Sequence, residues 1–320
     1  MTLPITKLSV PPTDPEVDAW VAVVTAAHAA DLPGTPAPTR VRIAGRLRVP
    51  PPTGHFAHWA TDGGVASLLL FTDAGNAHTA SLDRLEVRPD ARRQGVGTAL
   101  WHRVREELLA EGRTSVSATV DLGGPGQAFA ESLGFENVLP LGWYVHDVTA
   151  GPATAEPELP QGYELVCWEG LVPDAWVAAA AVAHGAMEDA PTGDLDEAAP
   201  AWTPQRLHAV QQLVLDRGGR MLMVAAVTAA GEVAAYTSLI LPDPSAPRAL
   251  QYDTVVVPAH RGCGLGRAVK LRMVTEGTAR FPALREISTS VADENTPMRT
   301  VNAALGYRHE RDAGIFQLKL

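Results

Sequence analysis

The sequence predicts an α/β (α+β) protein of two similar domains, and three observations support this prediction. The chain has 320 residues, whereas single hydrophobic cores stop growing at about 250–300 residues. Hydrophobic residues make up 46% of the chain and its mean hydropathy is +0.00, as is typical of globular proteins with a core. Each half also shows the same order of patterns: strand, helices, hairpin, strand, helix, strand, helix, strand.

A stretch of the first half recurs in the second half. Residues 87–97 and 256–266, which lie 169 positions apart, both place Val-x-Pro before an Arg-rich and Gly-rich turn. Further along, Leu-Gly-Phe at 133–135 corresponds to Leu-Gly-Tyr at 305–307. The matched order indicates an internal duplication whose period is too long for a solenoid.

A segment without periodicity separates the two copies. Residues 149–161 contain one glycine and three prolines among Ala and Glu, a composition typical of a linker. We therefore expect an N-terminal domain at 1–150, a linker at 151–161 and a C-terminal domain at 162–320.

The elements of the second half follow from local patterns. Alternation predicts a strand at 163–168, Thr203 before Pro204 predicts a helix start, and Ala-Ala-Gly between two apolar runs predicts a hairpin. In order, the expected elements are a strand at 163–168, helices at 173–187 and from 204, strands at 221–227, 232–241 and 250–257, a helix from the Gly-rich turn to about 280, a strand at 285–292, a helix at 297–305 and a strand at 314–320. In the first half, apolar residues at 96, 99, 100, 104 and 108 fall on one helical face.

Composition excludes several classes of protein. The 26 basic and 36 acidic residues give a net charge of −10, the opposite of the balance expected for a protein that binds nucleic acid. No apolar run reaches the roughly 18 residues of a membrane span, and residues 1–10 do not resemble a secretory signal. Two cysteines cannot build a disulfide framework, and His55 and His58 lack a third metal ligand nearby. We expect a cytoplasmic monomer or homodimer without metal and without a membrane partner.

The Gly-rich turn has the features of an anion site. Glycines expose backbone N–H groups where a helix begins, and the helix dipole favours negative charge there. A Walker loop is absent, and the third glycine of a dinucleotide fingerprint is replaced by Leu100 and Val269. What remains in both halves is Arg-x-x-Gly-x-Gly, which follows Val-x-Pro and opens a helix.

This combination resembles the central motif of the GNAT superfamily of acyl-CoA-dependent N-acyltransferases. The resemblance covers both halves and is strongest at 82–135 and 252–307. It implies, in each half, a mixed and mostly antiparallel central sheet flanked by helices. It also implies acetyl-CoA or another acyl-CoA as cofactor, and direct attack on it by a primary amine of a small molecule or peptide.

The resemblance further implies which residues hold acyl-CoA. In that superfamily the strand before the turn separates from its neighbour and binds the pantetheine arm, while the turn wraps the pyrophosphate. The strand residues are Thr254, Val255 and Val256, with Leu85, Glu86 and Val87 in the first half. The turn residues are Arg261, Gly262, Cys263, Gly264, Leu265, Gly266 and Arg267, with Arg92, Arg93, Gln94, Gly95, Val96 and Gly97 in the first half. We expect Cys263 to fill the turn rather than to act as a nucleophile.

Two polar positions of the superfamily distinguish the halves. Many members carry an Asn after the next strand and, seven residues later, a Tyr that protonates the CoA thiolate. The second half has Asn295 and Asn302 at these positions, and an amide is a poor acid. The first half has Gly123 and Ala130. We infer that the C-terminal domain is catalytic and that the N-terminal domain binds acyl-CoA idly or serves as scaffold.

The general base is not fixed by the pattern. Many members place a Glu four residues before the Val of Val-x-Pro, where this chain has Tyr252 and, in the first half, Asp83. Asp253 would face away from Tyr252 on an ideal strand, but a bulge would alter that. Tyr252 and Asp253 both remain candidates.

An acidic segment provides the best indication of the acceptor. Residues 187–197 contain five acidic residues, among them Glu188, Asp189 and Asp194, between helices that line the acceptor site in the superfamily. They could attract an ammonium group or simply form a solvated loop. The chain is distantly similar to the mycothiol synthases, tandem members that acylate an amine, and a non-catalytic acyl-CoA-binding protein is the alternative.

Overall fold

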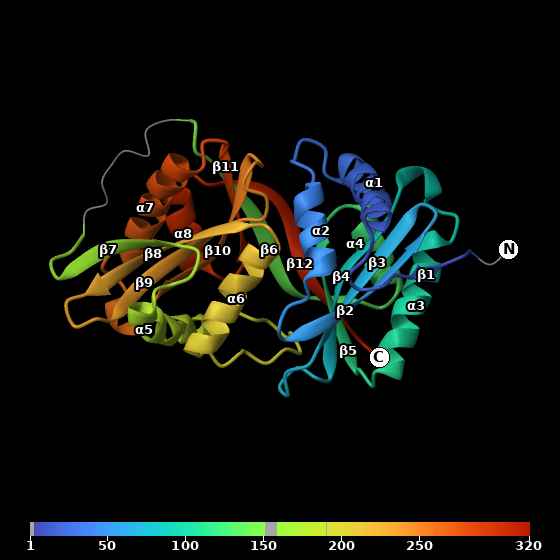
Figure 1. Ribbon diagram of the computed structural model, residues 1–320, viewed down its shortest axis with the longest axis horizontal. Helices are drawn as coiled ribbons and strands as arrows, with labels where there is room; N and C mark the ends of the chain where they lie inside the picture. Colours follow the sequence, from blue (N-terminus) through green and yellow to red (C-terminus); the bar gives the residue numbers. More distant parts are fainter. Residues whose placement is uncertain (1–2, 151–158, 190) are drawn as a thin grey trace. The chain divides into compact units, whose positions relative to one another are not determined.

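The computed structural model describes residues 3–150, 159–189 and 191–320, and these form two compact units (Figure 1). Unit 1 comprises the chain up to Pro140 together with Thr192–Ala198 and Asp312–Leu320. Unit 2 comprises Leu141–Pro191 and Ala199–Arg311. The units are therefore not the two contiguous halves, because each includes a segment from the other half. Most of the expected linker, at 151–158, lies outside the described residues.

Unit 1 is built on a sheet that is antiparallel except for one parallel pair, β4 with β5. In spatial order its strands are β1 (Thr6–Lys7), β2 (Gly54–Thr61), β3 (Gly64–Phe71), β4 (Thr79–Val87), β5 (Ser115–Asp121) and β12 (Arg308–Lys319). Its helices are α1 (Asp14–Asp31), α2 (Arg40–Arg48), η1 (Pro89–Ala91), α3 (Val96–Ala110) and α4 (Pro125–Ser132). The last strand comes from the second half of the chain and pairs antiparallel with β5.

Unit 2 repeats this plan with one parallel pair, β10 with β11. In spatial order its strands are β6 (Glu136–Asp147), β11 (Glu286–Ala292), β10 (Arg248–Val256), β9 (Val233–Leu241), β8 (Arg220–Thr228) and β7 (Tyr163–Glu169). Its helices are α5 (Asp174–Gly185), η2 (Ala186–Asp189), α6 (Pro204–Asp216), η3 (Pro258–His260), α7 (Leu265–Arg280) and α8 (Thr296–Ala304). Strand β6 comes from the first half and pairs with β11 through Leu141–Asp147. The predicted mixed, mostly antiparallel sheets flanked by helices are confirmed.

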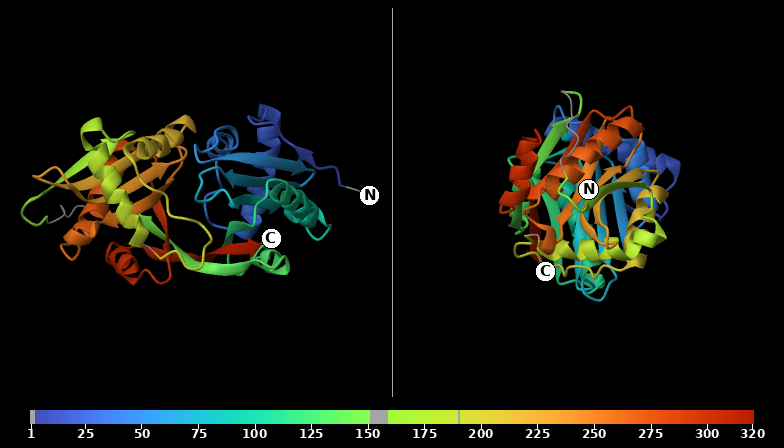
Figure 2. Two further views of the ribbon diagram at one scale, coloured as in Figure 1. Left: turned by 90° about the horizontal axis from the view of Figure 1, so that it is seen from below. Right: turned by 90° about the vertical axis from the view of Figure 1, so that its left-hand side faces the viewer.

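The sheet of unit 2 has a hydrophobic core on each face, as Figure 2 illustrates by the helices on both sides of the strands. On β8, Leu222 and Val224 pack with α7, whereas Met223 and Ala225 pack with α5 and α6. This alternation is the period of two that a strand dictates. Each residue of β10 therefore faces either the α7 side or the α5 side of the sheet.

Local signals fixed several element ends. The hydroxyl of Thr203 accepts a hydrogen bond from the backbone N–H of Arg206 at 3.1 Å, so the predicted N-cap is confirmed.

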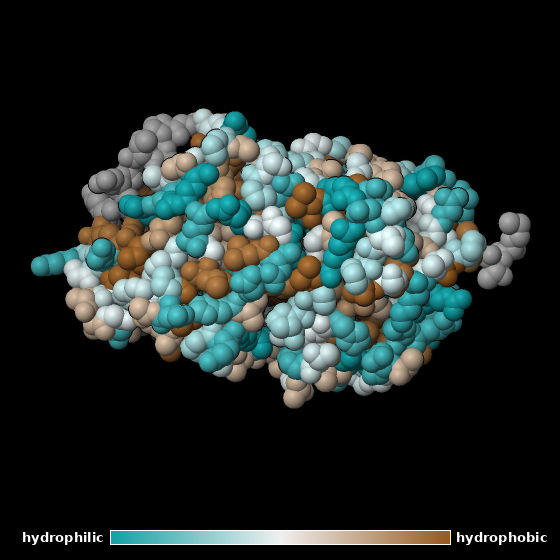
Figure 3. Space-filling view, viewed as in Figure 1, coloured by the Kyte–Doolittle hydropathy of each residue, from teal (hydrophilic) through white to brown (hydrophobic). Residues whose placement is uncertain are grey.

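None of the helices in the described part of the chain combines the length and apolarity that a membrane crossing requires. Figure 3 shows hydrophobic residues at the surface of unit 2 in the region of β7, although the side chains of β8 and β9 are almost all buried.

Candidate acyl-CoA site

The Gly-rich turn has the same backbone in both units. Gly95 (φ 83°, ψ 0°) and Gly264 (φ 78°, ψ 4°) are left-handed residues that precede α3 and α7. A Cβ atom added to either glycine would meet no other atom within 4 Å, so glycine is favoured here by its φ angle and not by crowding. The space over each turn is open, and the first N–H groups of each helix are oriented for an anion.

The first arginine of each turn is already engaged. Arg261 donates from Nε to the backbone oxygen of Val256 at 3.1 Å and from Nη2 to Asp189 at 2.6 Å. In unit 1, Arg92 likewise donates to the backbone oxygen of Val87 at 3.0 Å and to Asp31 at 2.7 Å and 2.8 Å. Both arginines thus brace the turn against the end of the preceding strand.

The remaining cations of the turns lie at the surface. Arg267 in unit 2 and Arg93 in unit 1 are exposed, as are Gly262, Cys263 and Gly264. We therefore expect the backbone amides, with Arg267 beside them, to supply the attraction for a pyrophosphate in unit 2. Asp189, which the sequence suggested as a contact for an amine, pairs with Arg261.

One position of the turn differs between the units. Arg93 has a φ of 62°, whereas Gly262 at the matching position has a φ of 79°. A side chain in this left-handed region costs about 1–2 kcal/mol. We expect Gly262→Ala to lower the free energy of unfolding by about 1 kcal/mol. Arg93→Ala should change it by less than about 0.5 kcal/mol, because a Cβ is already present there. Urea denaturation of both variants measures this difference, and equal losses would contradict it.

The parallel strands separate beyond their first residues in both units. Within the described chain, β10 pairs with β11 only through Arg248–Leu250 and Glu286–Ser288. Strand β4 pairs with β5 only through Thr79–Ser81 and Ser115–Ser117. The later part of each first strand, including Thr254–Val256, therefore has one backbone edge that no other strand occupies. An extended, polar chain could add to this edge as a peptide adds to a sheet.

A bulge interrupts β10 beside this open edge. The register against β9 shifts between Gln251 and Thr254. Ala249, before the shift, packs with α7, whereas Val255, after the shift, packs with α5. On a regular strand two residues six positions apart would face the same side, so the bulge reverses the side that β10 residues face. Tyr252 and Asp253 both lie within the shift. Alternation counted forward from Ala249 and back from Val255 puts both residues on the α5 side of the sheet.

The surroundings of Asp253 change the pKa of its carboxyl group. The pKa of Asp253 is raised to about 7, because burial disfavours its charged form. Among the described side chains it has no ion-pair partner. Tyr252, by contrast, is 61% exposed.

The carboxylate of unit 1 near the corresponding bulge is paired. The Nε of Arg46 donates to both carboxylate oxygens of Asp83, at 2.7 Å and 2.8 Å. Burial alone would raise the pKa of Asp83, but the charge and hydrogen bonds of Arg46 hold it below its ordinary value. Asp83 is therefore an ion-pair partner, while Asp253 is free to exchange a proton near neutral pH.

A buried polar group lies next to β10 on the α5 side. The Tyr236 hydroxyl and the Nδ1 atom of His184 are 2.7 Å apart, and both residues are buried. The His184 ring also packs against the rings of Tyr236 and Trp202, whose centres are 4.3 Å and 4.4 Å away. No sequence motif predicted this Tyr236–His184 pair. Its only signal was a histidine in an Ala-rich helix.

On the opposite side of the sheet, α8 and α7 carry two buried polar side chains. Neither the amide nitrogen nor the amide oxygen of Asn302 has a hydrogen-bond partner in the described structure, although both are buried. Asn295 caps α8 by accepting from the N–H of Met298 at 3.2 Å. The Nζ of Lys270, which the sequence analysis did not consider, lies 4.8 Å from the centre of the Tyr307 ring.

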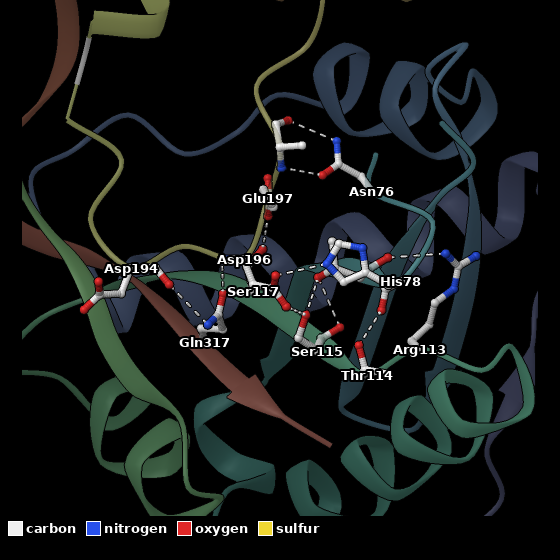
Figure 4. Close-up of polar contacts among 12 residues, drawn as sticks. Asn76, His78, Arg113, Thr114, Ser115, Ser117, Asp194, Asp196, Glu197 and Gln317 are labelled. Carbon is white, nitrogen blue, oxygen red and sulfur yellow. Dashed lines mark hydrogen bonds and ion pairs between the residues drawn. The ribbon is translucent and has the colours of Figure 1, made fainter. Parts of the chain in front are cut away.

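The acidic segment is divided between the units. Asp189 belongs to unit 2, but Thr192–Ala198, which we name the acidic strap, belongs to unit 1 (Figure 4). Asp196 accepts from Ser115 at 2.8 Å and lies 3.0 Å from Nε2 of His78, and Glu197 accepts from Ser117 at 2.8 Å. Two carboxylates of the strap thus bind the sheet of unit 1.

Two predicted contacts for the amine substrate remain, Asp194 and Glu188. The backbone N–H of Asp194 donates to Val138 at 3.3 Å, within unit 1. The side chain of Glu188 lies outside the described part of the chain. The described residues contain no group of three or more His, Cys, Asp and Glu that could hold a metal ion.

Comparisons with known proteins agree with this geometry. Residues 23–135 match the model of the Acetyltransferase (GNAT) family. The structure is similar to a tandem GNAT protein from the clavulanic acid biosynthesis pathway, with a TM-score of 0.84, 28% identity, and coverage of 99% of this chain and 98% of that one. No curated protein matches the chain.

Two further structures are similar in fold alone. A GCN5-related N-acetyltransferase from Sphaerobacter thermophilus has a TM-score of 0.71 at 17% identity, covering 99% of this chain and 97% of that one. The glucosamine N-acetyltransferase region of a fungal multi-domain β-N-acetylglucosaminidase has a TM-score of 0.65 at 15% identity, covering 99% of this chain and 38% of that one. The chain therefore carries a GNAT acetyltransferase domain and has the fold of a tandem GNAT protein along nearly its whole length.

Proposed function

We propose that the protein transfers an acyl group, acetyl in the first instance, from acyl-CoA to a primary amine, and that unit 2 performs the reaction. The observation that carries this proposal is Asp253. It is a partly buried carboxylate with a pKa of about 7, and it lies in a strand bulge beside the open edge of β10. A general base acts best when its pKa lies near the working pH.

The residues around the open edge fit an acyl-CoA molecule. The amides of the turn at Gly264 suit the pyrophosphate, and the open space there leaves room for it. The free edge of Thr254–Val256 suits the pantetheine arm. The buried amide of Asn302, without a partner among the described residues, could bond a polar atom of that arm or its sulfur.

The proposed reaction needs three proton transfers. Asp253 would accept one proton from the substrate ammonium, which frees the amine to attack the thioester that bound acyl-CoA supplies. A backbone N–H of β10 would donate to the developing oxyanion. As the amide forms, its nitrogen loses a second proton to water, and the leaving thiolate takes up a proton from Asp253 or from water, because Asn302 is a poor acid. The products are the amide, CoA thiol, the regenerated carboxylate and one proton released to solvent.

Unit 1 is proposed to be non-catalytic. Arg46 neutralises Asp83, and Gly123 and Ala130 stand where unit 2 has Asn295 and Asn302. The turn and the separated strands nevertheless support a unit that still binds acyl-CoA or serves as scaffold. We retain the expectation that each half arose as one domain, with the boundary near 151–161.

The acceptor is proposed to be a small molecule with a primary amine. The similar tandem GNAT protein comes from a biosynthetic pathway for a small molecule, which favours this choice over a peptide. A mycothiol synthase-like acceptor belongs to the same class. The second candidate function, a non-catalytic acyl-CoA-binding protein, is favoured by Asn302 at the position of the expected acid.

Release of CoA thiol from acetyl-CoA, measured across a panel of amines, tests this proposal. Amine-dependent release supports the enzyme. Tight binding of CoA without turnover for any amine would favour the binding protein instead.

A matched pair of glycine variants tests which unit works. Gly264→Ala and Gly95→Ala impose the same backbone strain, because both glycines have nearly the same φ and ψ angles and open surroundings. We expect Gly264→Ala to raise the KM for acetyl-CoA by about tenfold, since a Cβ would stand where the phosphate approaches. Gly95→Ala should leave turnover unchanged. A loss of turnover in Gly95→Ala alone would assign the reaction to unit 1.

A further inference from the structure

The Tyr236 hydroxyl has a single hydrogen-bond partner in the described structure, Nδ1 of His184 at 2.7 Å. Tyr236 is 0% exposed and His184 is 3% exposed, so water does not compete for this bond. A buried hydroxyl that does not donate is costly, and Nδ1 is the acceptor available to it among the described residues, so we assign the Tyr236 proton to this bond. The remaining ring proton of His184 is then on Nε2.

The histidine of this pair is held neutral and in a fixed orientation. Burial lowers the pKa of His184 to about 4, so the ring carries no charge at neutral pH. Contacts with the rings of Trp202 and Tyr236 restrict the orientation of the His184 ring. Its Nε2 atom is buried and has no partner among the described residues. The pair therefore offers neither a charge nor a spare hydroxyl proton to its neighbours.

Asp253 is one of those neighbours. Val255 lies directly opposite Tyr236 in the β9–β10 ladder, and Asp253 lies on the same face as Val255 after the bulge. Asp253 therefore lies near the diagonal position of Tyr236, which on a regular ladder is about 7–8 Å away. Consistent with this closeness, the charge of Asp253 adds to burial in raising the pKa of Tyr236.

We infer that His184 is a positioning residue for Asp253: by accepting the Tyr236 proton it keeps the tyrosine hydroxyl from donating to the carboxylate. The inference rests on the proposed function, in which Asp253 is the base. A carboxylate that accepts a hydrogen bond is a weaker base, because the bond stabilises its charged form. Without His184 the hydroxyl would be free to donate to Asp253 instead.

Other titratable groups on elements that pack against β10 are engaged or lie apart from this face. Asp189 on η2 pairs with Arg261, and Glu286 on β11 pairs with Arg248. Lys270 on α7 lies over the Tyr307 ring in the core of the opposite face. The variants below leave all of these groups in place.

Three variants separate this role from a structural one. His184→Phe keeps an aromatic ring in the stack but removes the acceptor, and we expect the acid limb of kcat/KM against pH to move about one unit lower. Tyr236→Phe removes the hydroxyl itself, so the limb should stay where it is in the unmodified protein. In His184→Phe/Tyr236→Phe the limb should return to that position. A limb that does not move in His184→Phe, or that stays shifted in the double variant, overturns the inference.

A second readout makes the test independent of turnover. Carbon NMR of the protein labelled at aspartate carboxyls follows the titration of Asp253 directly in all three variants, with Asp253→Asn to assign the signal. The same pattern of shifts is expected there. If amines do not promote thiol release but the NMR pattern appears, the proposed function fails and the positioning role stands. If thiol release occurs without the pattern, the positioning role fails alone.

Discussion

Asp253→Asn is expected to lower kcat/KM for amine acylation by about 10²–10⁴-fold at neutral pH, the typical contribution of a general base. The asparagine keeps the shape of the side chain but cannot accept the ammonium proton. In the unmodified protein the base is active above its pKa, so kcat/KM should fall as pH drops through about 7. That acid limb should be missing from the variant.

The same substitution should stabilise the fold at neutral pH. Burial raises the folded pKa of Asp253 to about 7 from an ordinary 3.8, so the native state binds the proton more tightly than the unfolded chain. Stability is therefore lost as pH rises from about 4 to about 7, and the asparagine variant avoids this loss. Lower activity with a higher unfolding midpoint is the combination to look for.

Tyr252→Phe is the matched control for this prediction. Tyr252 is adjacent to Asp253 but 61% exposed, and we expect its substitution to change kcat/KM by less than about threefold. A larger loss in Tyr252→Phe than in Asp253→Asn would assign the base to the tyrosine.

Lys270→Met is expected to raise the free energy of unfolding by about 2–4 kcal/mol at pH 7 or below. Lys270 is 1% exposed, and burial lowers its pKa from 10.5 to about 7. Methionine is similar in length and apolar, so it fills the same space without a charge. The attraction between the ammonium and the Tyr307 ring, worth about 1–2 kcal/mol, offsets part of the gain.

The pH dependence of this gain follows from the direction of the shift. Above about 10.5 the lysine is neutral in both states, and the two proteins should differ little. Between about 10.5 and 7 only the unfolded chain binds the proton, so the unmodified protein loses stability as pH falls. Below about 7 the difference should stay constant.

Urea denaturation at several pH values measures the effect, and Arg267→Met on the same helix serves as an exposed control that should show none. A decrease in stability in Lys270→Met would mean that the contact with Tyr307 outweighs the burial of the charge.

Local patterns predicted the features that depend on neighbouring residues. The turns at Gly95 and Gly264 and the cap at Thr203 were predictable because glycine, proline and threonine act on the backbone within a few positions. The predicted strand at 314–320 is part of β12, but the pattern could not tell which strand it joins. Its partner, β5, lies nearly two hundred residues earlier in the chain.

The features of the site that were missed depend on packing. His184 and Lys270 are ordinary residues in their helices. They gain importance only because Tyr236 and Tyr307, from other elements and connections of the fold, contact them in a dry core. The bulge at Tyr252 and Asp253 was considered but could not be predicted, because a register shift is a property of two strands and not of one sequence.

The exchange of strands sets the order in which the protein can be completed during synthesis. Most of unit 1 is made before unit 2, yet the sheet of unit 1 needs Asp312–Leu320 beside β5 and the acidic strap beside Ser115 and Ser117. Until those segments are made, β5 presents an unpaired edge to other nascent chains. Unit 1 is therefore finished only after nearly all of unit 2 has been made. A nascent chain halted after the first half would be exposed to aggregation rather than stored as a folded domain.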